Sequence, residues 1–327
     1  MHGRRNFLLF VILAATAPAP AVGQIVAPER SGSGTQRAAS VPDFSGIWAH
    51  PSFPGFEPLA SGPTSLRNRS RQYVCGAVNG VVGGPCPQGR GNFNQLVGDY
   101  TSPILKPQAA ETVRKLGEIS LRGATYPLPT THCWPEPVPY IFNGVAIQML
   151  QQPDKITFLY PNDHQMRRVR MNAAHPAHVM PSWYGDSVGH YEGDTLVIDT
   201  VGVKIGPFAV IDMFGTPYTE ALHVVERYRL IDYEDAKEGL ERDANENLFL
   251  PGGADAGSKA DPNYRGKHLQ LYFTVEDDGV FTMPWSATVT YRRGIEEWRE
   301  VVCAENTREL TIGGTAATVP RADKPDF

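Results

Sequence analysis

The sequence lacks the signatures of most cofactor-dependent proteins. It contains no phosphate-binding loop, dinucleotide-binding fingerprint, c-type haem attachment motif or EF-hand calcium loop, and nucleotide, flavin, haem and EF-hand functions are therefore not expected. Basic residues are also few, since 30 lysines and arginines stand against 35 aspartates and glutamates, whereas a nucleic acid partner requires a basic surface. We expect no cofactor and no nucleic acid partner.

Long hydrophobic runs are equally scarce. The apolar run at residues 7–15 is too short to cross a bilayer, which takes about 20 residues. It follows Arg4 and Arg5 and leads into small residues, an arrangement typical of a cleavable signal peptide over residues 1–23. The two arginines fit either a twin-arginine signal or an ordinary secretion signal. The sequence thus predicts a periplasmic or secreted protein whose mature chain has no membrane span.

Cysteine is rare, with four residues: Cys75, Cys86, Cys133 and Cys303. An even number of cysteines in an oxidising compartment predicts disulfides. Four cysteines would form two disulfides, and they can be paired in three ways. Cys75 and Cys86 bracket a glycine-rich stretch that can close on itself, and by elimination Cys133 would then pair with Cys303. A cysteine-based zinc site is the alternative, although no two cysteines show the two-residue spacing usual for structural zinc.

Glycine and proline, in contrast, are abundant and indicate many turns. The chain divides by texture into five parts: a signal peptide (1–23), a disordered linker (24–40), a loop-rich region (41–144), a β core (145–306) and a C-terminal tail (307–327). Within the loop-rich region, residues 107–121 are the one convincing helix, because they are good helix formers and Pro107 suits the first turn.

From residue 145 onward the hydrophobic period changes to two, which predicts β-strands. At least nine short strands are expected, several of them separated by turn sequences such as 192–194 and 277–279. With no helices between them, they predict an antiparallel sheet that closes or folds on itself as a calycin-like barrel or a β-sandwich. Residues 233–265, rich in acids, glycine and proline, interrupt the strands and are expected to form an excursion over one mouth.

Several motifs together resemble a known group of proteins. They are Gly-Asp-Ser-Val-Gly-His-Tyr-Glu-Gly-Asp-Thr-Leu-Val-Ile-Asp-Thr at 185–200, Asp-Phe-Ser-Gly-Ile-Trp at 43–48, Cys133 followed by prolines, Arg167-Arg168 before His175-Pro176, the acid-rich strand 220–228 and Cys-Ala-Glu-Asn at 303–306. In this combination the chain resembles a broad group of exported bacterial β-rich proteins without an assigned function. The resemblance covers most of residues 41–306 and implies export and a β-rich fold, but no reaction. Tyr191 departs from the group, which usually has tryptophan there.

His175 and His178 are the first candidates for chemistry. With His164 as a third ligand they could bind a metal ion, or either could act as a general acid or base near neutral pH. Pro176 disfavours the helical turn that a metal-binding pair at this spacing would use. Hydrogen-bonded surface histidines are the ordinary explanation. Between metal binding and acid–base use, the pattern favours acid–base use with no metal.

Two carboxylates are predicted on apolar strand faces. Glu226 lies in a row with Val224 and Tyr228, and Asp199 is flanked on its own face by valines. Burial of an isolated charge costs several kcal/mol, so each carboxylate must be paired or carry a raised pKa. A structural salt bridge to Arg168 or Arg227 is the ordinary explanation, and acid–base catalysis is the alternative.

Aromatic residues gather in the same loops and strand ends. Trp183, Tyr184, His190, Tyr191 and Trp134 suit a site for a flat or lipophilic molecule or a sugar, although core packing explains most aromatics of β proteins. The Gly-Asp-Ser block at 185–187 resembles the start of one class of esterases. Its position in mid-chain before a hairpin argues against serine hydrolase chemistry.

Together these features predict an exported β-rich protein that binds a small organic ligand. As an enzyme it would be a cofactor-independent hydrolase or lyase, in which His175 or His178 exchanges protons with Glu226 or Asp199 and Arg168 steadies negative charge. A lipocalin-like carrier with a large apolar cavity and an envelope interaction protein with an exposed apolar patch are the alternatives. The sequence predicts neither the ligand nor the oligomeric state.

Overall fold

The computed structural model describes residues 41–50, 55–69, 77–78, 81–82, 96–121, 128–144, 146–246, 263–294, 302–303, 308–309 and 317–318. Its main strands are β1 (Gly46–Ala49), β2 (Glu57–Pro58), β5 (Ala146–Gln151), β6 (Lys155–Leu159), β7 (Met166–Met171), β8 (Asp186–Glu192), β9 (Thr195–Val201), β10 (His223–Ile231), β11 (His268–Glu276) and β12 (Trp285–Arg293). Two small hairpins add β3 (Ala77–Val78) with β4 (Val81–Val82), and β13 (Arg308–Glu309) with β14 (Ala317–Thr318).

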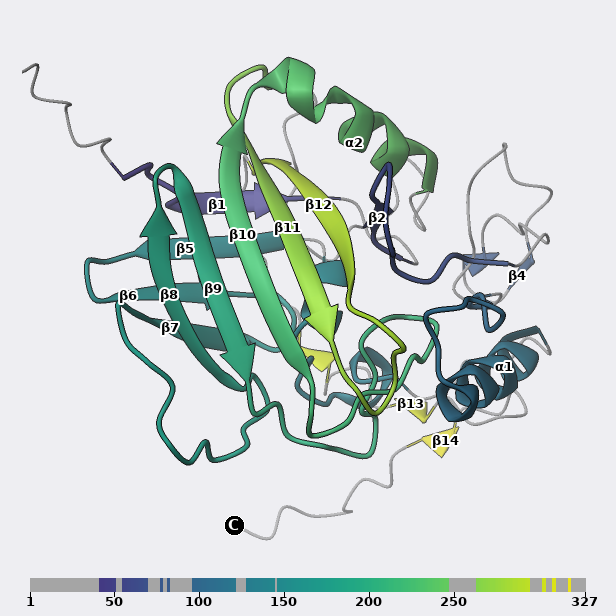
Figure 1. The fold of residues 1–327 in the computed structure, drawn as a ribbon. Coiled ribbons are helices and arrows are strands. Elements are labelled where there is room, and N and C mark those ends of the chain that lie inside the picture. The colour runs from purple at the N-terminus through teal and green to yellow at the C-terminus, as the bar shows by residue number, and fades with distance from the viewer. Residues whose placement is uncertain are drawn as a thin grey trace, which may run out of the picture. The chain divides into compact units, whose positions relative to one another are not determined.

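The ten main strands form one sheet in the order β1–β5–β6–β7–β8–β9–β10–β11–β12–β2 (Figure 1). An additional pairing of β1 with β12 closes nine of them into a barrel, and β2 pairs with β12 beside this closure. The predicted fold class is therefore confirmed, in its barrel form. The strand that closes the barrel comes from residues 46–49, within the region expected to be loop-rich.

One pairing differs from the antiparallel prediction. Strands β7 and β8 run parallel, with Val169 opposite Ser187 and Met171 opposite Gly189. A parallel pair cannot be joined by a tight hairpin, so the chain returns to the start of β8 through a long crossover loop, residues 172–185. This loop carries His175 and Trp183.

Strict alternation along the strands separates the barrel interior from its outer wall. On β10, Val224, Glu226 and Tyr228 are buried while Arg227 and Arg229 reach solvent. The interior is filled largely by aliphatic and aromatic side chains. Those that are fully buried include Phe158, Ile198, Leu271 and Phe273, each 0% exposed.

Helix α1 (Pro107–Leu121) confirms the predicted helix. It buries Ala109, Val113 and Gly117, which are four residues apart and so lie on one face. A Cβ added at Gly117 would lie 2.9 Å from a methyl carbon of Val97, so the absent side chain lets the helix approach this segment closely.

The segment expected to be an irregular excursion contains a second helix, α2 (Tyr233–Glu246). Glu234 and Asp235 lie in its first turn, where their negative charges stabilise the helix by interacting with the positive end of its dipole. Its apolar residues Ala236 and Leu240 are buried and pack with Ile231 at the end of β10. Two apolar positions are too few to stand out in the sequence, which explains why the pattern did not predict this helix. Short 3₁₀ turns occupy Thr130–His132 and Tyr140–Asn143.

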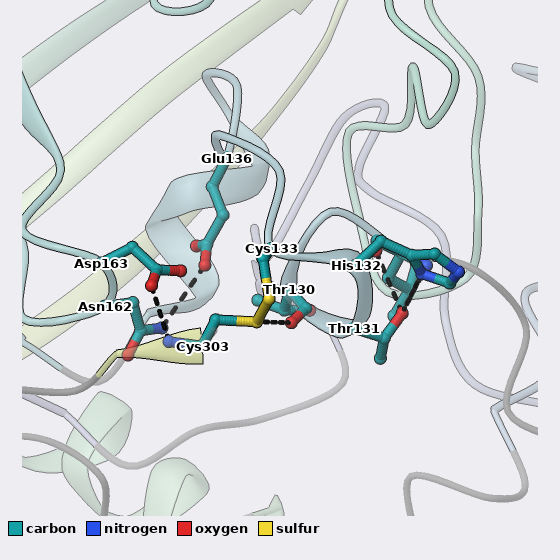
Figure 2. The surroundings of a disulfide bond; sticks show 9 residues. Thr130, Thr131, His132, Cys133, Glu136, Asn162, Asp163 and Cys303 are labelled. Carbon is teal, nitrogen blue, oxygen red and sulfur yellow. Dashed lines mark hydrogen bonds between the residues drawn. A yellow bond between two sulfur atoms is a disulfide. The ribbon is translucent and has the colours of Figure 1, made fainter. Parts of the chain in front are cut away.

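The predicted Cys133–Cys303 disulfide is present, with the two Cα atoms 5.3 Å apart (Figure 2). It joins a loop that precedes β5 to a segment that follows β12. Beside it, the Asp163 carboxylate accepts a hydrogen bond from the backbone N–H of Cys303 at 2.6 Å. Cys75, Cys86, the predicted signal peptide and the predicted linker lie outside the described residues.

No helix among the described residues is sufficiently long and apolar to cross a membrane.

Candidate functional site

A row of six polar side chains crosses the outer wall of the barrel. We call it the outer-wall row. Five members come from the five adjacent strands β7 to β11, and the sixth, His175, comes from the crossover loop. In order across the wall, the row consists of Arg170, Asp186, His175, Asp199, His223 and Glu276. They are side by side because these strands are neighbours in the sheet. Each of the six is at least partly exposed.

His175 occupies the centre of the outer-wall row. Its Nδ1 lies 2.7 Å from Asp186 Oδ2 and its Nε2 lies 2.9 Å from Asp199 Oδ1. An imidazole can donate through both nitrogens only when it carries both protons. Each ring nitrogen thus faces a carboxylate oxygen, while the side chain is still 24% exposed to solvent.

Asp199 connects His175 to a second histidine. Its other oxygen, Oδ2, lies 3.1 Å from His223 Nε2, and His223 Nδ1 lies 3.4 Å from Glu276 Oε2. The hydrogen bond from His223, more than that from His175, lowers the pKa of Asp199 against the opposing effect of burial. The same bond raises the pKa of His223. The two groups thus stabilise each other's charged forms.

Arg170 completes the outer-wall row. Its Nη2 lies 2.7 and 2.9 Å from the two oxygens of Asp186. Arg168, the arginine predicted to steady negative charge, is exposed on the same strand face and forms no hydrogen bond or ion pair with any described residue. In this structure Arg170, rather than Arg168, is the cation beside His175.

Glu226 lies inside the barrel, on the opposite side of the wall. It forms a two-pronged ion pair with Arg167, with Nη1–Oε2 at 2.9 Å and Nη2–Oε1 at 2.5 Å, and both side chains are almost fully buried. Tyr228 donates a further hydrogen bond to Oε2 at 2.9 Å. The hydroxyls of Ser187 and Thr200 accept further hydrogen bonds from Nε and Nη2 of the guanidinium. Such pairing offsets much of the cost of burying two charges.

The predicted partnership of His175 with Glu226 is therefore wrong. Strand β9 shows why: Asp199 faces outward to His175, whereas the next residue, Thr200, faces inward to Arg167. Successive side chains of a strand point to opposite faces, so the two sites are separated by the sheet itself. The ordinary explanation for Glu226, a structural salt bridge, holds, but with Arg167 in place of Arg168 or Arg227.

His178, the other predicted acid–base residue, is exposed in the crossover loop and forms no hydrogen bond or ion pair with the described residues. His164 lies at positive φ in the turn between β6 and β7. Across the described part of the chain, no group of three or more histidine, cysteine, aspartate or glutamate side chains is arranged to hold a metal ion.

Two of the five predicted ligand-binding residues come together in what we call the aromatic cluster: His132, Trp134, Trp183 and Phe208. The ring centroids of Trp134 and Trp183 are 5.0 Å apart, and those of Trp134 and Phe208 are 6.0 Å apart. Lys204 Nζ lies 4.8 Å from the Trp183 ring centroid. The tryptophans and Phe208 are half-buried and His132 is exposed, so the cluster presents ring surface to solvent.

The other three predicted ligand-binding residues lie apart from this cluster. Tyr184 packs against the core and donates a hydrogen bond to Gln165 at 2.9 Å. Tyr191 also packs against the core and accepts one from Gln151 at 2.9 Å. His190 is exposed, with Nε2 3.1 Å from Glu192.

A buried carboxyl that the sequence did not single out lies beside the disulfide. Glu136 is 4% exposed, and Figure 2 shows its carboxylate directed toward Asn162 and Asp163. Burial raises its pKa to about 7, opposed by hydrogen bonds from Asn162 and Gln165. Its position two residues after Trp134, among prolines, carries no periodic signal from which burial could be predicted.

Comparison of the chain with protein-family models, with curated proteins and with solved structures finds no match in any of the three. The resemblance to exported bacterial β-rich proteins, which is based on motifs, remains a prediction. The outer-wall row and the aromatic cluster are therefore the features that bear on function.

Proposed function

We propose that this protein is a cofactor-independent hydrolase or lyase that acts on a small organic molecule at the outer wall of the barrel. One observation carries the proposal. His175 is held between two carboxylates while partly exposed, and Asp199 links it to a second titratable histidine. An oriented, solvent-accessible imidazole with a proton relay behind it is the arrangement that general acid–base catalysis requires.

The chemistry would begin with proton donation. A leaving group of the substrate competes with one carboxylate for an N–H of His175, and the other carboxylate keeps the ring oriented. Once His175 has given up that proton, the freed nitrogen becomes an acceptor. It then takes a proton from an attacking water, which gives hydrolysis, or from the carbon next to the leaving group, which gives elimination. This second transfer returns to His175 the proton that it gave to the leaving group, and Asp199 and Asp186 keep the ring oriented.

The aromatic cluster supports the proposal because it offers a surface for the organic part of a substrate. Trp183 precedes Asp186 by three residues, so their Cα atoms are at most about 11 Å apart even in a fully extended chain. A molecule of modest size that stacks on Trp183 can therefore reach His175.

A lipocalin-like carrier, the first alternative, would hold its ligand inside the barrel. The inward-facing Phe158, Ile198 and Phe273 are fully buried, and the inward-facing Arg167 and Glu226 pair with each other rather than standing free for a ligand. These observations favour a site on the outer wall. The envelope interaction protein remains the second candidate, since Met180 in the crossover loop is 87% exposed.

We also propose that the protein works outside the cytoplasm. The Cys133–Cys303 disulfide supports this location, because disulfides persist mainly in oxidising compartments. Cleavage of residues 1–23 by a twin-arginine or general secretion route is part of the proposal. Amino-terminal sequencing of the protein recovered from a periplasmic fraction should begin close to residue 24. Recovery of a chain that still begins at Met1 from the cytoplasm would contradict it.

The catalytic proposal is tested with three variants and a panel of chromogenic esters, amides, glycosides and β-substituted acids. His175→Asn and Asp199→Asn should lose roughly a hundredfold or more of the turnover, because general acid–base catalysis contributes about that much. His178→Asn, from the same loop but outside the outer-wall row, should keep the wild-type rate. Full activity of His175→Asn, or no turnover of any compound by the wild type, would refute the proposal.

A further inference from the structure

The outer wall carries a second polar feature, a groove of about 330 Å³ lined by Thr195, Arg227, Arg229, Gln270 and Tyr272. We call it the arginine groove. It spans β9, β10 and β11 toward the ends of these strands that lie away from the outer-wall row. All five lining residues carry hydrogen-bonding groups, and none of them is acidic. Its size falls at the lower end of the range for small-molecule sites.

The two arginines share one strand face, so their Cα atoms are about 7 Å apart. Each is approached by an acid of the β8–β9 turn: Arg227 Nη1 lies 2.6 Å from Glu192 Oε2, and Arg229 Nη2 lies 3.6 Å from Asp194 Oδ2. Only one nitrogen of each guanidinium takes part in these contacts. The others form no hydrogen bond with any described residue.

The neighbours across the sheet add complementary chemistry. Tyr272 lies opposite Arg227, and Gln270 lies opposite Arg229, in the β10–β11 register. A tyrosine ring offers a flat apolar face, a glutamine amide both donates and accepts, and the hydroxyl of Thr195 does the same. Guanidinium groups with free N–H pairs bind carboxylates through two parallel hydrogen bonds.

We propose that the arginine groove binds an acidic sugar, that is, a pyranose with a carboxylate. The carboxylate pairs with the free guanidinium N–H groups, the ring lies against Tyr272, and the hydroxyls bond to Gln270 and Thr195. This binding does not depend on the catalytic proposal, because it concerns different residues and requires no turnover.

The test is a calorimetric titration of the purified protein at low salt with D-glucuronate, D-glucose and inorganic phosphate as separate ligands. Glucuronate should bind at least tenfold more tightly than glucose, which lacks the carboxylate, and than phosphate, which lacks the ring. Arg229→Gln should weaken glucuronate binding at least tenfold, and Arg229→Lys should weaken it too, because lysine keeps the charge but not the two-pronged geometry.

Arg168→Gln is the matched control, since Arg168 is an exposed outer-wall arginine that lies outside the groove. It should bind glucuronate like the wild type. Unfolding midpoints of all variants should stay within about 2 °C of the wild type, which excludes misfolding. Equal binding of glucose and glucuronate, equal binding of phosphate and glucuronate, or undiminished binding by Arg229→Gln would overturn the proposal. The last result would mean that Arg227 and Arg229 form only surface salt bridges.

Discussion

At the scale of single residues, the charged groups separate into buried and exposed sets according to the face of the strand. Period-two alternation predicted that Glu226 lies on an apolar face, and it does. Its partner was missed because Arg167 and Arg168 are adjacent and only one of them can point inward. The face of β7 that contains Arg167 also contains Val169 and Met171 and is the more apolar one. That comparison within one strand could have identified Arg167.

The Arg167–Glu226 pair leads to a stability prediction. Glu226→Gln leaves the Arg167 charge buried without its counter-ion and should lower the free energy of unfolding by about 3–5 kcal/mol. Denaturant unfolding measures the change. Glu220→Gln, an exposed glutamate without an ion pair to the described residues, should change it by less than about 0.5 kcal/mol. A loss below about 1 kcal/mol for Glu226→Gln would contradict the importance of the pair.

The raised pKa of Glu136 should make the free energy of unfolding depend on pH with a sign opposite to that of most carboxylates. Its pKa is about 7 in the folded chain against an ordinary value of 4.5, so the folded state holds its proton more tightly than the unfolded state does. The protonated Glu136 carboxyl stabilises the folded state fully below pH 4.5. This contribution to the free energy of unfolding, on the order of 3 kcal/mol, is lost as the pH rises to about 7. Glu136→Gln should remove this part of the slope and be the more stable form at pH 8.

The measurement is urea unfolding at several pH values, with Glu220→Gln as the control that retains the wild-type slope. Parallel pH profiles for Glu136→Gln and the wild type would show that the Glu136 carboxyl does not titrate in this interval.

At the scale of elements, the strands were predictable and their connections were not. The β-branched and aromatic runs marked β5 to β12, but neither period nor propensity specifies strand direction. The parallel pairing of β7 with β8 places residues 172–185 against the outer wall, and this placement brings His175 between Asp186 and Asp199. The outer-wall row therefore depends on topology, which a single sequence does not specify.

The ion pair of His223 with Asp199 should stabilise the folded chain most within a window of pH. The raised pKa of His223 means that its contribution is full below its ordinary pKa of 6.5 and is lost as the pH rises through the higher folded value. The lowered pKa of Asp199 means that its contribution is full above 3.8 and is lost as the pH falls through the lower folded value. Both contributions to the free energy of unfolding are therefore full between about pH 4 and 6.5. Urea unfolding of the wild type and of His223→Asn at several pH values measures the part that His223 supplies.

The difference in unfolding free energy between the wild type and His223→Asn should shrink as the pH rises above 6.5, because the imidazole of the wild type loses its charge there. His190→Asn, which removes an exposed histidine outside the outer-wall row, should leave the profile unchanged. A difference between the wild type and His223→Asn that does not vary with pH would contradict the stabilising role of the charged His223.

At the scale of the whole described molecule, closure of the barrel depends on contacts between distant parts of the chain. Strand β1 has four residues and comes from a region without strand periodicity, yet it joins β5 to β12. So short a strand is determined by the edges it bridges rather than by its own composition. This explains why the sequence predicted a sheet that closes on itself but not which strand closes it.

The outer-wall row and the arginine groove lie on the same wall. Along β10, His223 and Arg227 both face outward and are four residues apart, or about 13 Å. A substrate held by its carboxylate in the groove must extend over roughly this distance to present a bond to His175 and His223. The two sites together would then select acidic oligosaccharides over single sugars.

The disulfide provides the last test, because it encloses most of the barrel. Cys133 precedes β5 and Cys303 follows β12, with 170 residues between them in sequence. A cross-link over so long a loop stabilises the folded state by restricting the unfolded chain, by about 5 kcal/mol in the chain-entropy model and more often 2–4 kcal/mol in practice. The double variant Cys133→Ser/Cys303→Ser should lose about 2–4 kcal/mol in urea unfolding while it keeps the far-ultraviolet circular dichroism of the barrel. Unchanged stability would mean that the two ends of this loop are already close together in the unfolded chain, since only then would the cross-link remove little entropy.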